Sequence, residues 1–477
     1  MLSVKEAECV GFDSKWRVKK IAATSSSQTD EILKQNSETN TSEKKSIETQ
    51  TDAPRINYDV KYDVNKLGNF LKRIYPKLAA ELDDDSSSSI FKNYCPFDEP
   101  IFSKAKIVQT VNVNLEVKDN VASRVNSLSW NSTGNTIAVS SDYPHQNWCH
   151  HFGFVSLYTF DRYEMFPEIP SRKVKTGACV RAVAFHPKLP YILSAGTHTG
   201  DIYLWNIQHD ENEMLVDKIV GHDDSITGMQ WIVRNDKNDD MVLATSSTDG
   251  FINMWKFSSK AHQLILKRKY KMKPPILQKQ PEMTLETDLC KSIGPGILGF
   301  HFSYFTPEKF VVAAEGGIVV QCSTLGAQTI IGTTGDTVPI LNPCVLFCEP
   351  HNDQITTIKF SPNHKEQFLT NSVDGEIRIY LLEQDTPVRV ICLKKPLSVV
   401  NWVPYHDKVI TGCGRFGLEV FNVITSEKYD DVCENEVDEL THMEINSKRP
   451  TVVVSGTYDG KMNLWSIPWA SFSNSTN

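Results

Sequence analysis

The chain has 477 residues, a formal net charge of −8 at pH 7 and 11 cysteines. This length can bury a large core, and the acidic balance argues against a general nucleic-acid binder, which would carry a basic surface. An odd cysteine count, with no Cys-x-x-Cys pair and no His/Cys spacing suited to zinc, predicts thiols in a reducing compartment and neither metal nor cofactor. Because it shows neither a secretory signal nor a run of about 18 apolar residues, we expect an intracellular protein without membrane insertion.

Residues 1–60 differ from the rest of the chain in composition. The stretch 22–54 is dominated by Ser, Thr, Gln, Asn, Glu and Lys, with almost no aromatic or large aliphatic residue. Such a segment buries too little apolar surface to offset the entropy lost on ordering, so we predict a disordered arm. Two similar tetrapeptides lie in this arm: Ser27, Gln28, Thr29 and Asp30 in the first, and Thr49, Gln50, Thr51 and Asp52 in the second.

Both tetrapeptides resemble the recognition motif of the eight-kilodalton dynein light chain, a small dimer. In that family the peptide adds a strand to a sheet edge, where backbone hydrogen bonds supply affinity and alternate side chains enter pockets. The resemblance implies that Gln28 and Gln50 are the central residues of two light-chain motifs. Because Ser27 replaces the leading Thr, we expect the first motif to bind more weakly. Chance occurrence in a tail rich in Ser, Thr and Gln is the alternative.

An amphipathic segment opens the next region, residues 61–106, which also contains a linker. Its apolar residues recur at steps of three and four, as on one face of a helix. We expect Pro76 to kink or divide this short helix, because proline removes an internal hydrogen bond. Its apolar face needs cover from the following domain or from a partner. The face comprises Leu67, Phe70, Leu71, Ile74, Leu78 and Leu82.

From residue 107 the chain repeats a glycine followed five residues later by an aromatic residue. In the clearest copy, Asp249-Gly250 separates two alternating apolar runs, which is a strong hairpin signal. Seven units at a period of about 40–50 residues predict an all-β fold, a seven-bladed β-propeller over 107–467 with a C-terminal tail at 468–477. The pairs are Gly153/Tyr158, Gly200/Trp205, Gly250/Trp255, Gly375/Tyr380 and Gly460/Trp465, with weaker copies at Gly317/Cys322 and Gly417/Phe421.

An additional strand precedes the first unit. Val111, Val113, Leu115 and Val117 alternate with polar residues, as in a half-buried strand. Since the last unit supplies only three strands, we expect this N-terminal strand to complete the seventh blade and close the ring. The basic run 267–273, between the third and fourth units, is interpreted as a solvated insert.

The third unit carries His222, Ser247, Asp249 and Trp255, and these residues resemble the signature of WD-repeat proteins. In that family the equivalent residues form a structural hydrogen-bond network. A hydrolase site built on the same His, Ser and Asp is the alternative. Because buried polar groups need such partners, we favour the structural network and predict no catalytic residue. The run 456–461 resembles a phosphate loop but has one residue too few between its glycines.

The order of light-chain motifs, amphipathic helix and WD-repeat propeller resembles the dynein intermediate chains. The local runs SQTD, TQTDAP, YDVNKLGNFLKRI, SLSWNSTG, AFHP and AAEGG resemble the shorter WD-repeat type found in cytoplasmic dynein-2, the retrograde motor of cilia. The resemblance implies a non-catalytic subunit whose propeller binds the dynein-2 heavy chain. The arm would pair with a second WD-repeat intermediate chain through dimeric light chains, and the helix at 67–82 would bind a roadblock-type light chain.

The same resemblance implies a role in retrograde intraflagellar transport and cilium assembly. The expected location is the cytoplasm, the cytoskeleton and the cilium, at its axoneme and basal body. A WD-repeat adaptor of another complex, such as a substrate receptor of a ubiquitin ligase, is an alternative that leaves the arm and the helix unexplained. An intermediate chain of an axonemal or cytoplasmic dynein-1 motor is another. A dynein-1 chain would begin with a long charged helix, which residues 1–20 do not show.

Overall fold

The structure is a computed structural model that describes residues 64–87, 104–113, 123–143, 149, 151–210, 213–233, 241–258, 263–272, 294–330, 338–430, 432–433 and 438–473. It divides into two compact units, Met1–Ser88 and Ser89–Asn477. The predicted arm and both light-chain tetrapeptides lie outside the described residues. Of the described helices, none is both long and apolar enough to cross a membrane.

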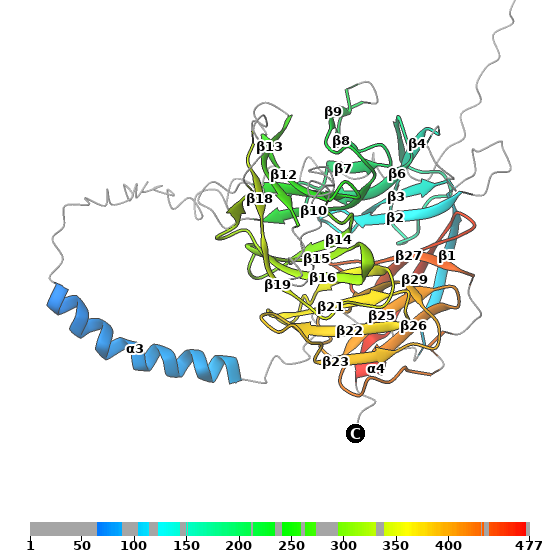
Figure 1. Cartoon of the computed structure of the whole chain (residues 1–477). Helices are drawn as coiled ribbons and strands as arrows, with labels where there is room; N and C mark the ends of the chain where they lie inside the picture. The colour runs from blue at the N-terminus through cyan, green and yellow to red at the C-terminus, as the bar shows by residue number, and fades with distance from the viewer. Residues whose placement is uncertain are drawn as a thin grey trace, which may run out of the picture. The chain divides into compact units, whose positions relative to one another are not determined.

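The first unit contains the helix α3 (Val64–Ser87), drawn in blue in Figure 1. Pro76 lies inside α3 and does not divide it, contrary to one of the two outcomes expected from the sequence. The helix also continues past Leu82, whose side chain is not among those described. Ile74 is half-buried. The other described side chains of the predicted apolar face are about half exposed: Leu67 46%, Phe70 47%, Leu71 54% and Leu78 55%.

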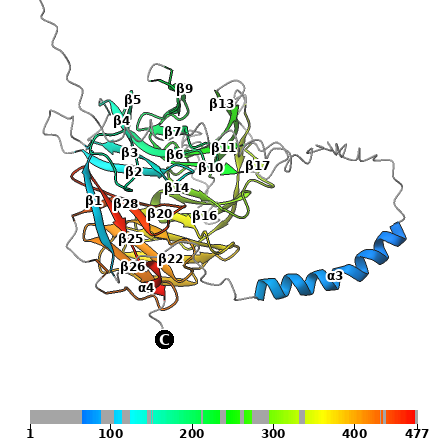
Figure 2. The ribbon, with the colours of Figure 1, turned by 180° about the vertical axis from the view of Figure 1, so that it is seen from behind.

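Seven sheets make up the blades of a propeller in the second unit, confirming the predicted fold (Figures 1 and 2). The first blade has β2 (Arg124–Trp130), β3 (Thr136–Asp142), β4 (Gly153–Thr159) and β5 (Arg172–Thr176). The second has β6 (Val180–Phe185), β7 (Ile192–Thr197), β8 (Asp201–Asn206) and β9 (Leu215–Val220). The third has β10 (Ile226–Val233), β11 (Met241–Ser247), β12 (Phe251–Ser258) and β13 (Gln263–Lys271).

The remaining blades follow in chain order. The fourth has β14 (Ile297–Phe302), β15 (Lys309–Ala314), the short 3-10 helix η1 (Glu315–Gly317), β16 (Ile318–Ser323) and β19 (Cys344–Phe347). The fifth has β20 (Ile355–Phe360), β21 (Gln367–Ser372), β22 (Glu376–Leu381) and β23 (Arg389–Cys392). The sixth has β24 (Leu397–Trp402), β25 (Val409–Gly414) and β26 (Gly417–Asn422), and the seventh has β27 (Leu440–Ile445), β28 (Val452–Thr457) and β29 (Lys461–Ser466).

A strand before the first blade closes the ring as predicted, but it ends earlier than the alternating run that predicted it: Val113 follows the strand, and Leu115 and Val117 lie outside the described residues. β1 (Lys106–Asn112) pairs antiparallel with β29, and Val111 lies opposite Met462. Both ribbon views show blue β1 beside the orange and red strands of the seventh blade (Figures 1 and 2). Closure joins residues far apart in sequence, so the two ends of the repeat array protect each other's edges.

The basic run predicted to be an insert instead lies largely in the fourth strand of the third blade, β13. Charge alone misled the interpretation, because Tyr270 and Met272 alternate with the basic residues and are buried. β13 also pairs in parallel with β18 (Ile340–Asn342), which pairs with β17 (Gln328–Thr329). These two short strands extend the third blade to six strands.

The hydrophobic core is divided into clusters that join neighbouring blades. In one cluster, Val125 and Tyr158 of the first blade pack with Met462 of the seventh. At the C-terminal end of the described residues, α4 (Trp469–Ser473) packs in the cluster of the sixth and seventh blades. Trp469 is fully buried there, and its Nε1–H donates to the Pro450 carbonyl at 2.7 Å. Burial and a satisfied indole N–H together hold α4 in place.

Candidate functional site

A chain of side-chain hydrogen bonds links the β9–β10 connection to the third blade. Trp255 Nε1 donates to Thr245 Oγ1 at 3.0 Å, and Thr245 Oγ1 lies 2.9 Å from His222 Nε2. His222 Nδ1 lies 2.9 Å from Asp249 Oδ2. Because the Asp249 carboxylate can only accept, Nδ1 carries the proton that it donates, and in this neutral tautomer Nε2 accepts the proton of the Thr245 hydroxyl. The order of donors therefore assigns the tautomer of His222.

Asp249 fixes the β11–β12 turn that follows this network. Its Oδ1 accepts from the Phe251 amide at 2.9 Å, and its amide donates to Ser247 Oγ at 3.1 Å. Burial alone would raise the pKa of Asp249, but hydrogen bonds from His222 and two backbone amides lower it below its usual range. Gly250 completes the turn at φ 83°, a conformation that favours glycine.

The sequence analysis placed Ser247 in the same network as His222, but the structure gives the linking position to Thr245. Ser247 lies two residues further along the strand, where it accepts a hydrogen bond from the following turn. Strand periodicity alone could not have found the difference, because Thr245 and Ser247 lie on the same face of the strand and only the hydrogen bond from the Trp255 indole distinguishes Thr245.

A second network of the same kind lies in the fifth blade. His351 Nδ1 lies 3.0 Å from Asp374 Oδ2, and His351 Nε2 lies 2.8 Å from Thr370 Oγ1. Tyr380 stands where Trp255 stands in the third blade, but its hydroxyl donates to the Glu349 carbonyl at 3.2 Å. The sequence analysis found Tyr380 through its pairing with Gly375 and missed His351, because no Gly-His pair precedes the blade.

Neither network is arranged for catalysis. The side chains of His222 and His351 are fully buried, at 0% exposure. Both ring nitrogens of each histidine already have hydrogen-bond partners. A general base must reach the proton that it removes from a substrate. These side chains instead tie the connection between two blades to the turn and central strand of the next blade.

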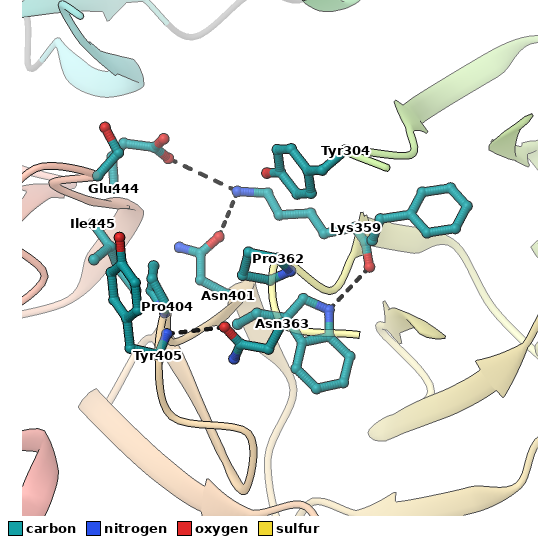
Figure 3. Close-up of a pocket in the computed structure, with 12 residues that line it drawn as sticks. Tyr304, Lys359, Pro362, Asn363, Asn401, Pro404, Tyr405, Glu444 and Ile445 are labelled. Atoms are coloured by element: carbon teal, nitrogen blue, oxygen red, sulfur yellow. Dashed lines mark hydrogen bonds and ion pairs between the residues drawn. The ribbon is translucent and has the colours of Figure 1, made fainter. Parts of the chain in front are cut away.

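Figure 3 shows a pocket that lies at the ends of several innermost strands of the propeller. It has a volume of about 330 Å³ and follows the ends of β14, β20, β24 and β27. Lys359 lies at its centre, donates a hydrogen bond to Asn401 Oδ1 and lies 3.8 Å from Glu444 Oε2. The aromatic and proline side chains around this polar centre are Tyr304, Phe360, Pro362, Trp402, Pro404 and Tyr405.

The pocket contains the ion pair of Lys359 and Glu444, and two uncharged histidines lie beside it. Burial and the Lys359 ammonium lower the pKa of His301 and of His442 to about 3. Burial also raises the pKa of Glu444, while Lys359 opposes that rise. A compact, largely apolar pocket with few polar groups is suited to holding an apolar side chain of a partner.

The backbone rigidifies one wall of the pocket. Tyr405 has φ 66°, and its amide donates to Asn363 Oδ1 at 2.9 Å. Asn363 in turn donates to the Val403 carbonyl at 3.0 Å. A non-glycine residue in this conformation is held by its surroundings, so the position of the Tyr405 ring at the pocket rim is specified by the fold.

The similarities of the chain to known proteins agree with this architecture. Residues 171–206, 214–256 and 342–380 match the WD40 family model, "WD domain, G-beta repeat". The first matched segment contains β5 to β8, so each sequence repeat joins the outer strand of one blade to three strands of the next.

Relatives match over more of the chain than the repeats alone. The chain is 24% identical over 420 residues to cytoplasmic dynein 2 intermediate chain 2 of Homo sapiens, covering 85% of this chain and 76% of that protein. The same protein of Mus musculus is 25% identical over 425 residues, or 86% of this chain and 77% of the relative. Dynein axonemal intermediate chain 1 of Bos taurus is 21% identical over 344 residues, or 69% of this chain and 45% of the relative.

Proposed function

Because the chain is a WD40-repeat protein and a homologue of the dynein intermediate chains, we propose that it is a non-catalytic intermediate chain of cytoplasmic dynein-2. The observation that carries this proposal is the extent of the similarity. The alignment covers 85% of the chain, which is a larger share than the propeller residues 107–467 represent. The match therefore includes sequence outside the propeller. The axonemal relative matches a smaller share of this chain at lower identity, which favours the dynein-2 assignment.

In this proposal the propeller binds the dynein-2 heavy chain, and the rest of the chain is a scaffold for light chains. The tetrapeptides at 27–30 and 49–52 bind dimers of the eight-kilodalton light chain. Each dimer also holds the arm of the second WD-repeat intermediate chain, so later binding events become nearly intramolecular. The protein would then act in retrograde intraflagellar transport and cilium assembly, in the cytoplasm and the cilium.

The helix α3 is proposed to bind a roadblock-type light chain. Its apolar residues follow the period of a helix, and Leu67, Phe70 and Leu71 are about half exposed. An amphipathic helix that places an apolar face in the groove of a partner buries such a face with little rearrangement. The closed networks around His222 and His351 support a structural role for the propeller, with the energy for movement supplied by the heavy chain.

We place the heavy-chain contact at the pocket around Lys359. The pocket combines aromatic side chains with a few polar groups, which is the composition of interface positions that dominate binding. Tyr304 and Tyr405 are 59% and 43% exposed at its rim, so a partner can bury them.

Co-expression of the full chain with the tail of the dynein-2 heavy chain tests both levels of this proposal. We expect the two chains to co-elute in size-exclusion chromatography. Tyr304→Ala combined with Tyr405→Asn should weaken binding by about 10-fold or more, as expected for interface aromatics. Asparagine is chosen because it tolerates positive φ. Tyr163→Ala, at an exposed tyrosine of the first blade, is the control.

The experiment distinguishes a wrong assignment to dynein-2 from a wrong position of the heavy-chain contact. If the unmodified chain does not bind the heavy-chain tail, the assignment to dynein-2 is wrong. If it binds and the double variant binds equally well, only the placement of the contact at this pocket is wrong.

A further inference from the structure

Two connections at the junction of the first and second blades bring together two thiols and an imidazole. Cys149 and His151 belong to the β3–β4 connection, and Cys179 precedes β6. Their potential ligand atoms all lie within 4.8 Å of one another. Cys179 is buried, Cys149 is half-buried and His151 is exposed, and neither cysteine forms a disulfide. The sequence analysis found no zinc spacing because the ligands are divided between two connections.

This cluster lies where one blade connection lacks the histidine that two others have. A Cβ atom built on Gly200 would lie 2.1 Å from the His222 carbonyl oxygen, and one on Gly317 would lie 2.2 Å from that of His351. At the first blade the same close approach joins Gly153 to the carbonyl oxygen of Ala178, at 2.2 Å. Ala178 therefore occupies the position of His222 and His351 but supplies no imidazole to tie the β5–β6 connection down.

Backbone and aromatic contacts hold the two thiols and the imidazole in place. The Cys179 amide donates to Cys149 Sγ at 3.3 Å. The Tyr143 ring also lies against the imidazole of His151, with ring centroids 5.0 Å apart. Outer contacts of this kind orient metal ligands and support the negative charge on sulfur.

One carboxylate and two arginines lie near the cluster. Asp142, next to Tyr143, is buried and lies 3.1 Å from Arg181 and 3.6 Å from Arg124. A divalent cation would offset the negative charges of two thiolates.

We propose that Cys149, His151 and Cys179 bind one Zn²⁺ ion, with a solvent molecule as the fourth ligand. Two thiolates and an imidazole suit zinc, whereas Mg²⁺ and Ca²⁺ require oxygen ligands. On binding, each thiol loses its proton to solvent and its sulfur forms a bond to the metal. With Zn–S near 2.3 Å and Zn–N near 2.0–2.1 Å, the ligand atoms of a tetrahedral site lie roughly 3.5–3.8 Å apart. The exposed His151 can supply the small contraction required.

The proposed ion has a structural role. It cross-links the β3–β4 connection of the first blade to the β5–β6 connection that leads into the second. In the third and fifth blades the corresponding connection is held by His222 and His351. The zinc site thus replaces a hydrogen-bond network with metal–ligand bonds, whether or not the chain is a dynein subunit.

The test uses the full chain, expressed with added zinc and purified without chelator. Elemental analysis should find about one Zn²⁺ per chain. Cys149→Ser and His151→Gln should each weaken zinc binding by more than about 100-fold in competition with a chelator, because loss of a supporting contact alone costs about 10–100-fold. Cys392→Ser, which removes an exposed cysteine of the fifth blade, should retain the ion. Replacement by Co²⁺ should give a thiolate-to-metal absorption band that the Cys149→Ser protein lacks.

Three results would overturn the proposal. The first is an equal zinc content in the parent chain and in His151→Gln. The second is a folded parent chain that has neither zinc nor the cobalt band. The third is a Cys149–Cys179 disulfide in freshly isolated protein whose thiols were blocked at lysis. Far-UV circular dichroism establishes that each variant is folded. If Cys149→Ser does not fold, His151→Gln decides, because it changes an exposed side chain.

Discussion

His351 Nδ1 lies 3.0 Å from Asp374 Oδ2, and this contact joins the connection before the fifth blade to the β21–β22 turn. Burial lowers the pKa of His351, with Asp374 opposing that effect. Burial alone would raise the pKa of Asp374, but hydrogen bonds from His351 and two backbone amides lower it. The pair at neutral pH is therefore a neutral imidazole that donates to a charged carboxylate.

Removal of this acceptor should destabilise the propeller. Asp374→Ala leaves the buried Nδ1–H of His351 without its carboxylate, and an unsatisfied buried donor costs about 1–3 kcal/mol of unfolding free energy. Denaturant titration of the full chain measures the loss. Asp430→Ala, at an exposed carboxylate, should change the unfolding free energy by less than about 0.5 kcal/mol. Equal stability of the two variants would contradict a structural role for the pair.

Stability should fall on acidification because several histidines are held neutral. Burial lowers the pKa of His186 to about 4, and that of His301 and His442 to about 3, from an ordinary value of 6.5. The unfolded chain binds more protons than the folded one between these values, so the stabilising contribution is complete above pH 6.5 and is lost as the pH falls toward 4. Thermal unfolding at about pH 7 and about pH 5 should show a lower Tm in acid.

A histidine variant provides the control for this pH dependence. His442→Gln should reduce the slope of stability against pH, whereas His209→Gln, at an exposed position, should leave it unchanged. A Tm that is constant between pH 7 and pH 5 would show that these imidazoles are not kept neutral by the fold.

Substitution of two adjacent glycines can distinguish the cost of backbone strain from the cost of a steric clash. Gly316 and Gly317 have φ of 76° and 73°, but a Cβ on Gly316 would meet nothing within 4 Å, while one on Gly317 would lie 2.2 Å from the His351 carbonyl oxygen. Alanine at either site carries the cost of positive φ, above about 1 kcal/mol. We expect Gly317→Ala to lose clearly more stability than Gly316→Ala in denaturant titration. Similar losses would show that the close approach of the two connections is not required.

The apolar face of α3 should be needed for a roadblock-type light chain. Leu71→Asp with Ile74→Asp places two charges on this face and should abolish co-purification of that light chain, since burying unpaired charge is costly. Asn69→Asp adds a charge on the opposite face and should leave binding intact. Persistent binding by the double variant would contradict the assignment, and a fall in propeller Tm would indicate that the helix instead covers the propeller.

The two glutamines of the arm should control binding of the eight-kilodalton light chain. Gln28→Ala with Gln50→Ala should weaken binding by about 10-fold or more in calorimetry, because each glutamine is the central side chain of a β-augmentation motif. Gln35→Ala, in the same arm, is the matched control. The Tm of the propeller should not change. Unaltered light-chain affinity in the double variant would contradict the motif assignment.

The repeated glycine–aromatic spacing predicted the number of blades, and strand alternation predicted the closure by β1, because both depend on local periodicity. The contributions of Thr245 and His351 to the networks were missed, since neither occurs in a recognisable dipeptide. The burial of Trp469 and the strand character of β13 depend on tertiary packing that charge and position along the chain do not reveal. The thiol–imidazole cluster was hidden because Cys149 and Cys179 meet only once two connections are folded together.

The most direct test of the account is affinity purification of the full-length chain from ciliated cells, with partners identified by mass spectrometry. We predict recovery of the dynein-2 heavy chain, a second WD-repeat intermediate chain and both kinds of light chain. Recovery of an axonemal or dynein-1 heavy chain, or of ubiquitin-ligase components in place of a motor, would contradict the proposed function.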